Sequence, residues 1–105
     1  MSSIFERPSK FSEAGQEYEL AVPEYTFTHH DVQRFTYGQE PYVIAQVPVA
    51  GGSKVEVRAL AVWWSATHVQ IEWTDESINM FNCWLPKADV KRVDLMEWDG
   101  RYVPR

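Results

Sequence analysis

The chain has 105 residues, of which 45% are hydrophobic and 24% charged, a composition that fits a single ordinary globular domain. Its formal net charge of −5 and its pI of about 5.1 argue against general affinity for the phosphate backbone of nucleic acids. A single cysteine, Cys83, excludes an intrachain disulfide, and the longest apolar run, residues 59–64, is too short to span a bilayer.

The composition of residues 1–24 predicts an extended, flexible N-terminal arm. The segment is polar, and its few apolar residues follow neither a helical nor a strand period. It carries two basic and five acidic residues, so its formal charge is 2 − 5 = −3. One interpretation is a disordered terminus. The other is an arm that orders when it docks on a partner through its apolar side chains, Ile4, Phe5 and Phe11.

We expect residues 25–94 to form the folded domain and residues 95–105 to form a short C-terminal tail. Four runs rich in β-branched and aromatic residues are separated by short polar or glycine-rich turns, which is typical of an antiparallel sheet. The expected strands cover residues 42–49, 54–64, 68–74 and 78–85. Pro86 ends the last of them because proline has no backbone donor for the ladder. The end of the 54–64 strand is apolar on both faces, so it needs a second covering surface.

The segment Ala61–Val93 resembles a small SH3-like barrel of the Tudor or KOW type. Such modules carry a hairpin like THVQIEW–TDES–INMFNCWLP, then a one-turn helix, here KADV, and a short last strand, here KRVDL. The resemblance implies a mostly β fold, a small SH3-like antiparallel β-barrel, and it is specific for architecture rather than for function. Short chains that combine a barrel with an apolar-studded arm also look like small phage-encoded proteins.

No pattern of residues predicts catalysis, a cofactor or a metal centre. His29 and His30 are adjacent, and adjacent side chains on a strand point to opposite faces, so the pair is a poor ligand set for one ion. Cys83 falls on the expected inner face of a strand, which favours a buried structural thiol. Neither a glycine-rich phosphate loop nor a Ser/His/Asp arrangement is present. We therefore expect a protein that is not an enzyme and uses no cofactor.

Five tryptophans in a chain of this length are the strongest functional signal. Trp63 and Trp64 are neighbours on a strand, so one of them faces away from the core. Because Trp and Tyr dominate the binding energy of protein interfaces, we expect a protein-interaction module. Its expected binding residues, besides those of the arm, are Trp64, Trp84, Trp98 and Tyr102. The alternative is that the arm and the tail of the same chain fold over these rings.

A nucleic-acid-associated SH3-like module is the second functional hypothesis. Its contacts would come from the basic residues Lys87, Lys91 and Arg92, although acidic residues interleave with them. For the preferred hypothesis we expect a protein partner, a homo- or hetero-oligomeric assembly such as a virion, or a host target of a phage protein, and no membrane partner. No signal-peptide pattern is present, so we expect a cytoplasmic or virion-associated protein.

Overall fold

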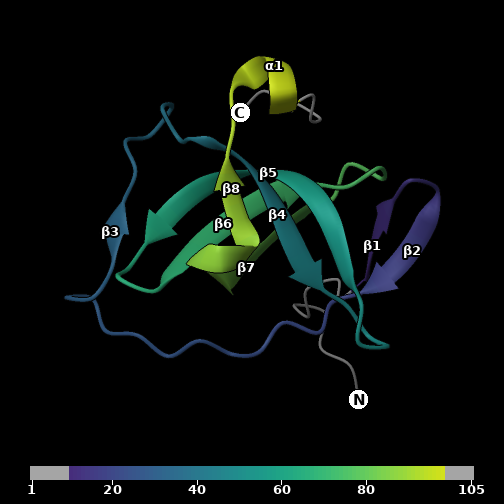
Figure 1. The fold of residues 1–105 in the computed structure, drawn as a ribbon, viewed down its shortest axis with the longest axis horizontal. Helices are drawn as coiled ribbons and strands as arrows, with labels where there is room; N and C mark the ends of the chain where they lie inside the picture. The colour runs from purple at the N-terminus through teal and green to yellow at the C-terminus, as the bar shows by residue number, and fades with distance from the viewer. Residues whose placement is uncertain (1–9, 99–105) are drawn as a thin grey trace.

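A computed structural model describes residues 10–98, which form one sheet of six strands and a separate two-stranded hairpin (Figure 1). The strands are β1 (Lys10–Glu13), β2 (Gln16–Glu19), β3 (Gln33–Arg34), β4 (Tyr42–Pro48), β5 (Lys54–Trp64), β6 (His68–Thr74), β7 (Met80–Pro86) and β8 (Val90–Arg92). A 3-10 turn, η1 (Lys87–Asp89), joins β7 to β8, and a short helix, α1 (Leu95–Trp98), follows.

The large sheet is antiparallel throughout, with the strand order β7-β6-β5-β4-β8 and with β3 paired to the end of β5. The mostly β fold expected from the sequence is confirmed, and the four expected strands agree with β4 to β7 to within a few residues. Between residues 10 and 98, no ladder joins β7 to β8, so backbone pairing does not close this sheet into a barrel.

Alternation along the strands builds the core. In β4, every second side chain is buried, and the equivalent residues of β5 face the same interior. Ile71 of β6 and Leu85 of β7 are fully buried against them. Burying one such side chain stabilises the fold by about 1.5–3 kcal/mol. The core is therefore a single cluster enclosed by the curled sheet, and its two ends are the places where the strands start and stop.

An irregularity in β5 accounts for the run that is apolar on both faces. The pairing with β6 shifts between Ala61 and Trp63, as a β-bulge does, so Val62 has no partner on β6. Strand β3 extends the sheet along the edge of this run, and side chains cover the rings in part. The Arg34 guanidinium lies 5.8 Å from the centre of the Trp63 ring, and the Phe35 ring lies 6.1 Å from that of Trp64. Gln33 and Arg34 pair with the two tryptophans, and the amide of Phe35 donates to the carbonyl of Val62 at 2.9 Å.

The N-terminal region differs from the flexible arm expected over residues 1–24. Strands β1 and β2 form a tight hairpin, whose turn residues Ala14 and Gly15 both have positive φ, at 51° and 77°. Phe11 of β1 is only 1% exposed and belongs to the core, so the expectation that it docks on a partner is wrong. The packed unit thus begins at Lys10 rather than at residue 25. Ile4 and Phe5 lie outside the described residues.

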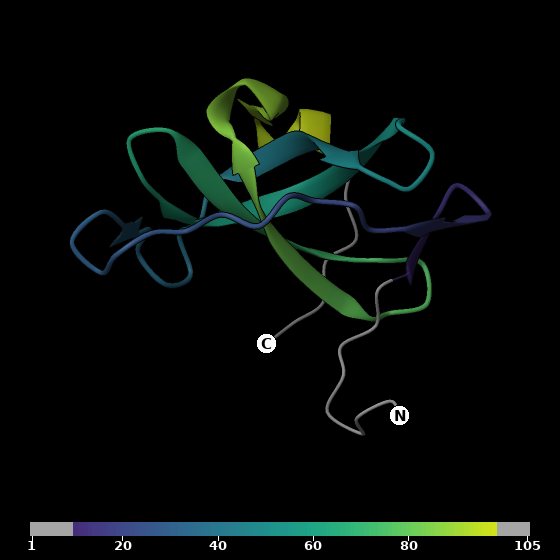
Figure 2. The same cartoon turned by 90° about the horizontal axis from the view of Figure 1, so that it is seen from below.

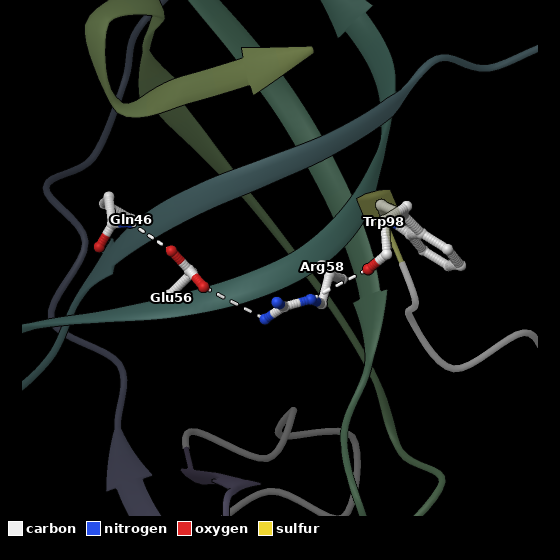
Figure 3. Close-up of polar contacts among 4 residues, drawn as sticks. All are labelled: Gln46, Glu56, Arg58 and Trp98. Atoms are coloured by element: carbon white, nitrogen blue, oxygen red, sulfur yellow. Dashed lines mark hydrogen bonds and ion pairs between the residues drawn. The ribbon is translucent and has the colours of Figure 1, made fainter. Parts of the chain in front are cut away.

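The start of the tail also folds back on the sheet. Trp98 is 4% exposed, and its indole Nε1 donates to the carbonyl of Ala59 at 2.9 Å. Its ring lies 5.0 Å from that of Tyr42, and Arg58 Nε donates to its carbonyl at 3.0 Å (Figure 3). Trp98 therefore stabilises the chain's own fold and is not the exposed binding residue expected from the sequence. Tyr102 lies outside the described residues.

Candidate functional site

The two ends of the core are covered to different degrees, and we name each end by one of its aromatic residues. The Phe11 end comprises the β1–β2 hairpin, the β6–β7 turn and the adjoining ends of β4 and β5. The Trp64 end comprises β3, the end of β5, the start of β6 and η1. Figure 2 shows the hairpin and the β6–β7 turn on one side of the molecule and β3 on the opposite side.

The Phe11 end is closed by an aromatic plug. The Phe11 ring meets Trp73 edge-on at 5.5 Å and Phe81 at 5.9 Å, and Tyr18 of β2 covers it at 5.7 Å. Aromatic pairs in such geometries add about 0.5–1.5 kcal/mol each to the energy of burial. The hairpin therefore acts as a lid over this end of the core.

One buried carboxylate fastens the lid to the sheet. Asp75, which is 2% exposed, follows β6, and its Oδ2 accepts from the amide and the hydroxyl of Ser12 at 3.0 and 3.2 Å. Its Oδ1 accepts from the amides of Ser77 and Asn79, each at 2.9 Å. Desolvation by burial raises the pKa of Asp75, but these hydrogen bonds favour the charged form and hold its pKa below 3.8. The carboxylate is thus charged at neutral pH and ties the hairpin to the β6–β7 turn.

The Trp64 end keeps an open pocket of about 270 Å³. Its apolar lining comes from four strands, β4, β5, β6 and β8, and from the segment between β3 and β4: Phe35, Pro41, Val43, Ala61, Trp64, Val69 and Val90. Trp64 is half-buried, and Phe35 lies beside it with a ring separation of 6.1 Å. Phe35 thus covers this end only in part: the half-buried side chains of Trp64, Val69 and Val90 line the opening, whereas Val43 and Ala61 behind them are buried.

Two cations complete the lining of the pocket. Lys87 Nζ lies 5.8 Å from the centre of the Trp64 ring, and Arg92 projects from β8 on the same side as Val90. Neither side chain forms an ion pair with another residue in the range 10–98, whereas Lys54 and Arg58 both do. Lys91, between Val90 and Arg92 on β8, does not line the pocket. The structure therefore brings together Trp64, Lys87 and Arg92, which the sequence had assigned to two separate hypotheses.

Trp84 is covered by the chain itself. The extended segment after β2 crosses the outer face of the β6–β7 hairpin and places Phe27 and Tyr25 at 4.9 and 5.1 Å from the Trp84 ring. Tyr25 also stacks on His68 at 3.8 Å, and its hydroxyl shares a hydrogen bond of 2.8 Å with Ser65. This packing is the alternative in which the protein's own N-terminal region covers the rings, and it leaves Trp84 a poor partner-binding residue.

Other chemistry has little support in the described part of the chain. Burial raises the pKa of the Cys83 thiol to about 12, so this side chain stays protonated and unreactive at neutral pH. Residues 10–98 contain no cluster of three or more His, Cys, Asp or Glu side chains suited to a metal ion. Within the same range, no helix has the length and apolar character needed to cross a membrane.

Comparisons with known proteins found no matching family model, no similar curated protein and no similar solved structure. The phage or virion setting expected from the sequence stays a prediction. Among the residues that line the pocket, sequence reasoning singled out Trp64, Lys87 and Arg92 and missed the remaining apolar ones: Phe35, Pro41, Val43, Ala61, Val69 and Val90. Val69 alternates with His68 and Gln70, which favours an inner face, but nothing in the pattern indicates that this face is left open. Phe35 follows a two-residue strand that is too short to show any period.

Proposed function

We propose that this chain is a non-enzymatic, SH3-like protein-interaction module, and that its Trp64 pocket receives an apolar side chain flanked by a carboxylate on a partner protein. The observation that carries the proposal is the pairing of an apolar pocket with two cations that have no carboxylate partner among residues 10–98. An apolar side chain would gain burial in the pocket, and a neighbouring carboxylate would meet Lys87 and Arg92.

The SH3-like assignment is supported by the order of the strands. Four consecutive strands, β4 to β7, form a meander, a single 3-10 turn follows, and the short β8 returns to pair with β4. This arrangement matches the hairpin, one-turn helix and last strand by which the sequence resembles such modules. The β1–β2 hairpin and α1 lie outside that pattern and cover parts of it.

The size of the pocket favours a side chain over a drug-sized ligand. Pockets that enclose such ligands typically measure about 300–1,000 Å³, and this one is about 270 Å³ and open. That volume suits one aliphatic or aromatic side chain, which acts as an anchor in the way interface hot spots do. The pocket is also assembled mainly on strands, so it is preformed and needs little ordering when a partner binds.

The charge of the molecule favours protein over nucleic acid. A protein with a net charge of −5 repels phosphate backbones as a whole, and the pocket contributes only two cations. Stacking of bases also needs an open aromatic face, whereas Trp64 is half-buried beside Phe35. The nucleic-acid-associated module therefore remains the second hypothesis, to be tested alongside the first.

Short synthetic peptides with one central leucine or phenylalanine between glutamates would test the proposal by calorimetric titration. We expect binding to the wild type and at least about tenfold weaker binding to the double variant Lys87→Glu/Arg92→Glu. Lys91→Glu is the matched control for the single variant Arg92→Glu, because each changes the charge of β8 by −2 and only Arg92 lines the pocket. That control should change affinity by less than about twofold.

Two results would contradict the proposal. The first is a failure of every peptide in such a panel to bind the wild type. The second is tighter binding of single-stranded oligonucleotides than of peptides, lost in the double variant and weakened steeply by salt, which would support the nucleic-acid hypothesis.

A further inference from the structure

The β6–β7 turn presents an exposed apolar pair at the Phe11 end, away from the pocket. Ile78 is 62% exposed and Met80 is 55% exposed, two positions apart in the sequence. Ile78 has φ +64°, a left-handed conformation that a β-branched residue rarely adopts. We call this pair, Ile78 and Met80, the turn knob.

The strain at Ile78 is imposed by its surroundings. Asp75 fixes the turn through its side chain, and the amide of Ile78 donates to the carbonyl of Asp75 at 3.1 Å. The amide of Asp75 in turn donates to the carbonyl of Asn79 at 3.0 Å. An asparagine or glycine at position 78 would tolerate this φ, whereas the apolar side chain present gains little burial from its own chain. Strained conformations that persist in this way are concentrated at functional sites.

The turn knob and the pocket are both apolar, and they are complementary in charge. Around the knob, the hairpin and turn carry Lys10 against Glu13, Glu17, Glu19, Asp75 and Glu76, a formal charge of 1 − 5 = −4. The pocket at the opposite end presents Lys87 and Arg92 beside an apolar cavity. An apolar side chain near carboxylates is the ligand chemistry proposed above for this pocket, and the chain carries such a group itself.

We propose that the partner at the Trp64 pocket is a second copy of this chain, which inserts its turn knob; this inference rests on the proposed function of the pocket. Figure 2 shows the β6–β7 turn, which carries the knob, and β3, which lies beside the pocket, on opposite sides of the molecule, so the contact is head-to-tail. A head-to-tail contact uses two different surfaces, so each added copy leaves one knob and one pocket free. Such contacts build rings or filaments rather than stopping at a symmetric dimer.

Sedimentation of the full-length wild type should show this growth directly. We expect the average mass to rise beyond that of a dimer as concentration increases from about 10 µM to about 1 mM. A mass that stays at that of a monomer over this range would overturn the inference. So would a species that stops at a dimer and keeps that mass in the knob variant.

Ile78→Asn is the informative knob variant, because asparagine tolerates positive φ and the fold should persist. We expect it to remain monomeric where the wild type associates. Leu95→Asn/Met96→Asn is the matched control: these residues are 59% and 94% exposed on α1 and form a second exposed apolar pair within residues 10–98. If the control abolishes association and Ile78→Asn does not, α1 is the contact and the turn knob is not.

Mixing two defective variants gives the sharpest test. Ile78→Asn keeps its pocket and Lys87→Glu/Arg92→Glu keeps its knob, so each alone should be monomeric. Their equimolar mixture should form a 1:1 heterodimer and nothing larger, because only one knob–pocket pair remains. A mixture that stays monomeric overturns the inference.

Peptide binding separates this inference from the proposed function. If acidic apolar peptides bind the pocket but the wild type does not associate, the pocket serves another protein and only the self-association is refuted. If neither peptides nor a second copy bind, the proposed function fails as well.

Discussion

Both ends of the core are lined by apolar and aromatic side chains, but they differ in how completely the chain covers them. At the Phe11 end, a hairpin of the same chain inserts an aromatic ring and a buried aspartate fastens it. At the Trp64 end, Phe35 covers only part of the interior, and an apolar pocket with two cations remains. The closed end is filled by an apolar group that a charged group holds in place, and our proposal is that the open end is filled in the same manner by a partner.

The way in which the Phe11 end is closed therefore indicates which chemical groups would fit the Trp64 end. Phe11 is supplied by the chain and fixed by the carboxylate of Asp75. At the open end the charged groups are cations, so the occupant that we propose carries the carboxylate itself. The predictions below test whether the two ends differ in this way, in order of decreasing effect.

The largest effect is expected from opening the closed end. Phe11→Ala removes a ring that is 1% exposed, so we expect the free energy of unfolding to fall by about 3–5 kcal/mol. Trp64→Ala removes a larger but half-buried ring, and we expect a loss below about 2 kcal/mol. Urea denaturation of both variants measures the comparison. Equal losses would mean that the two ends are closed to the same degree.

A smaller loss of stability is expected from weakening the hydrogen bonds by which Asp75 holds the β1–β2 hairpin. Asp75→Asn replaces one acceptor oxygen by a donor, so part of the hydrogen bonding from Ser12 or from the turn amides is lost. We expect the free energy of unfolding to fall by about 1–3 kcal/mol. Glu76→Gln is the control, because its amide oxygen can still accept from Gly15, and it should change stability by less than about 0.5 kcal/mol. A loss as large in the control would point to the net charge of the turn instead.

Asp75 should also make the closed end sensitive to acid. Its pKa in the folded state is held below its value of 3.8 in the unfolded chain, so the unfolded state binds the proton more readily. The stabilisation is present above pH 3.8 and is lost as the pH falls through the lower folded pKa. Denaturation curves measured from about pH 5 to about pH 2 should show this loss in the wild type, and a smaller loss in Asp75→Asn. Identical pH profiles for the two proteins would contradict it.

The smallest expected change is a gain rather than a loss of stability. Ile78→Asn relieves a left-handed conformation at an exposed position, so we expect stability to rise by about 1 kcal/mol. Ile78→Val keeps the β-branch and should bring no such gain. Thermal and chemical denaturation measure both variants. A loss of stability in Ile78→Asn would show that this side chain contributes to the fold of the Phe11 end.

The sheet could be predicted because its signals are local. Alternation and turn residues specify β4 to β7, and Pro86 ends β7 by its own chemistry. The hairpin at residues 10–19 was missed because only Phe11 and Tyr18 of its apolar residues reach the core. The Ala14-Gly15 turn was its one local signal.

The candidate site could be predicted only in part. Trp64 was singled out because it neighbours Trp63, and Lys87 and Arg92 because they are basic, but their meeting at one pocket depends on β8 returning to β4. Phe11, Trp84 and Trp98 were assigned to a partner because a sequence shows that a ring needs a cover without showing which segment supplies it. In each case a segment distant in the chain does so.

The most direct test of the open and closed ends follows two indole N–H signals by NMR while an acidic, leucine-containing peptide is added. Trp64 lines the pocket, and Trp73 lies beneath Phe11 at the closed end. We expect a saturable shift of the Trp64 signal and a stationary Trp73 signal. A shift of Trp73 with Trp64 unchanged, or no shift of either, would contradict the assignment of the Trp64 pocket as the binding site.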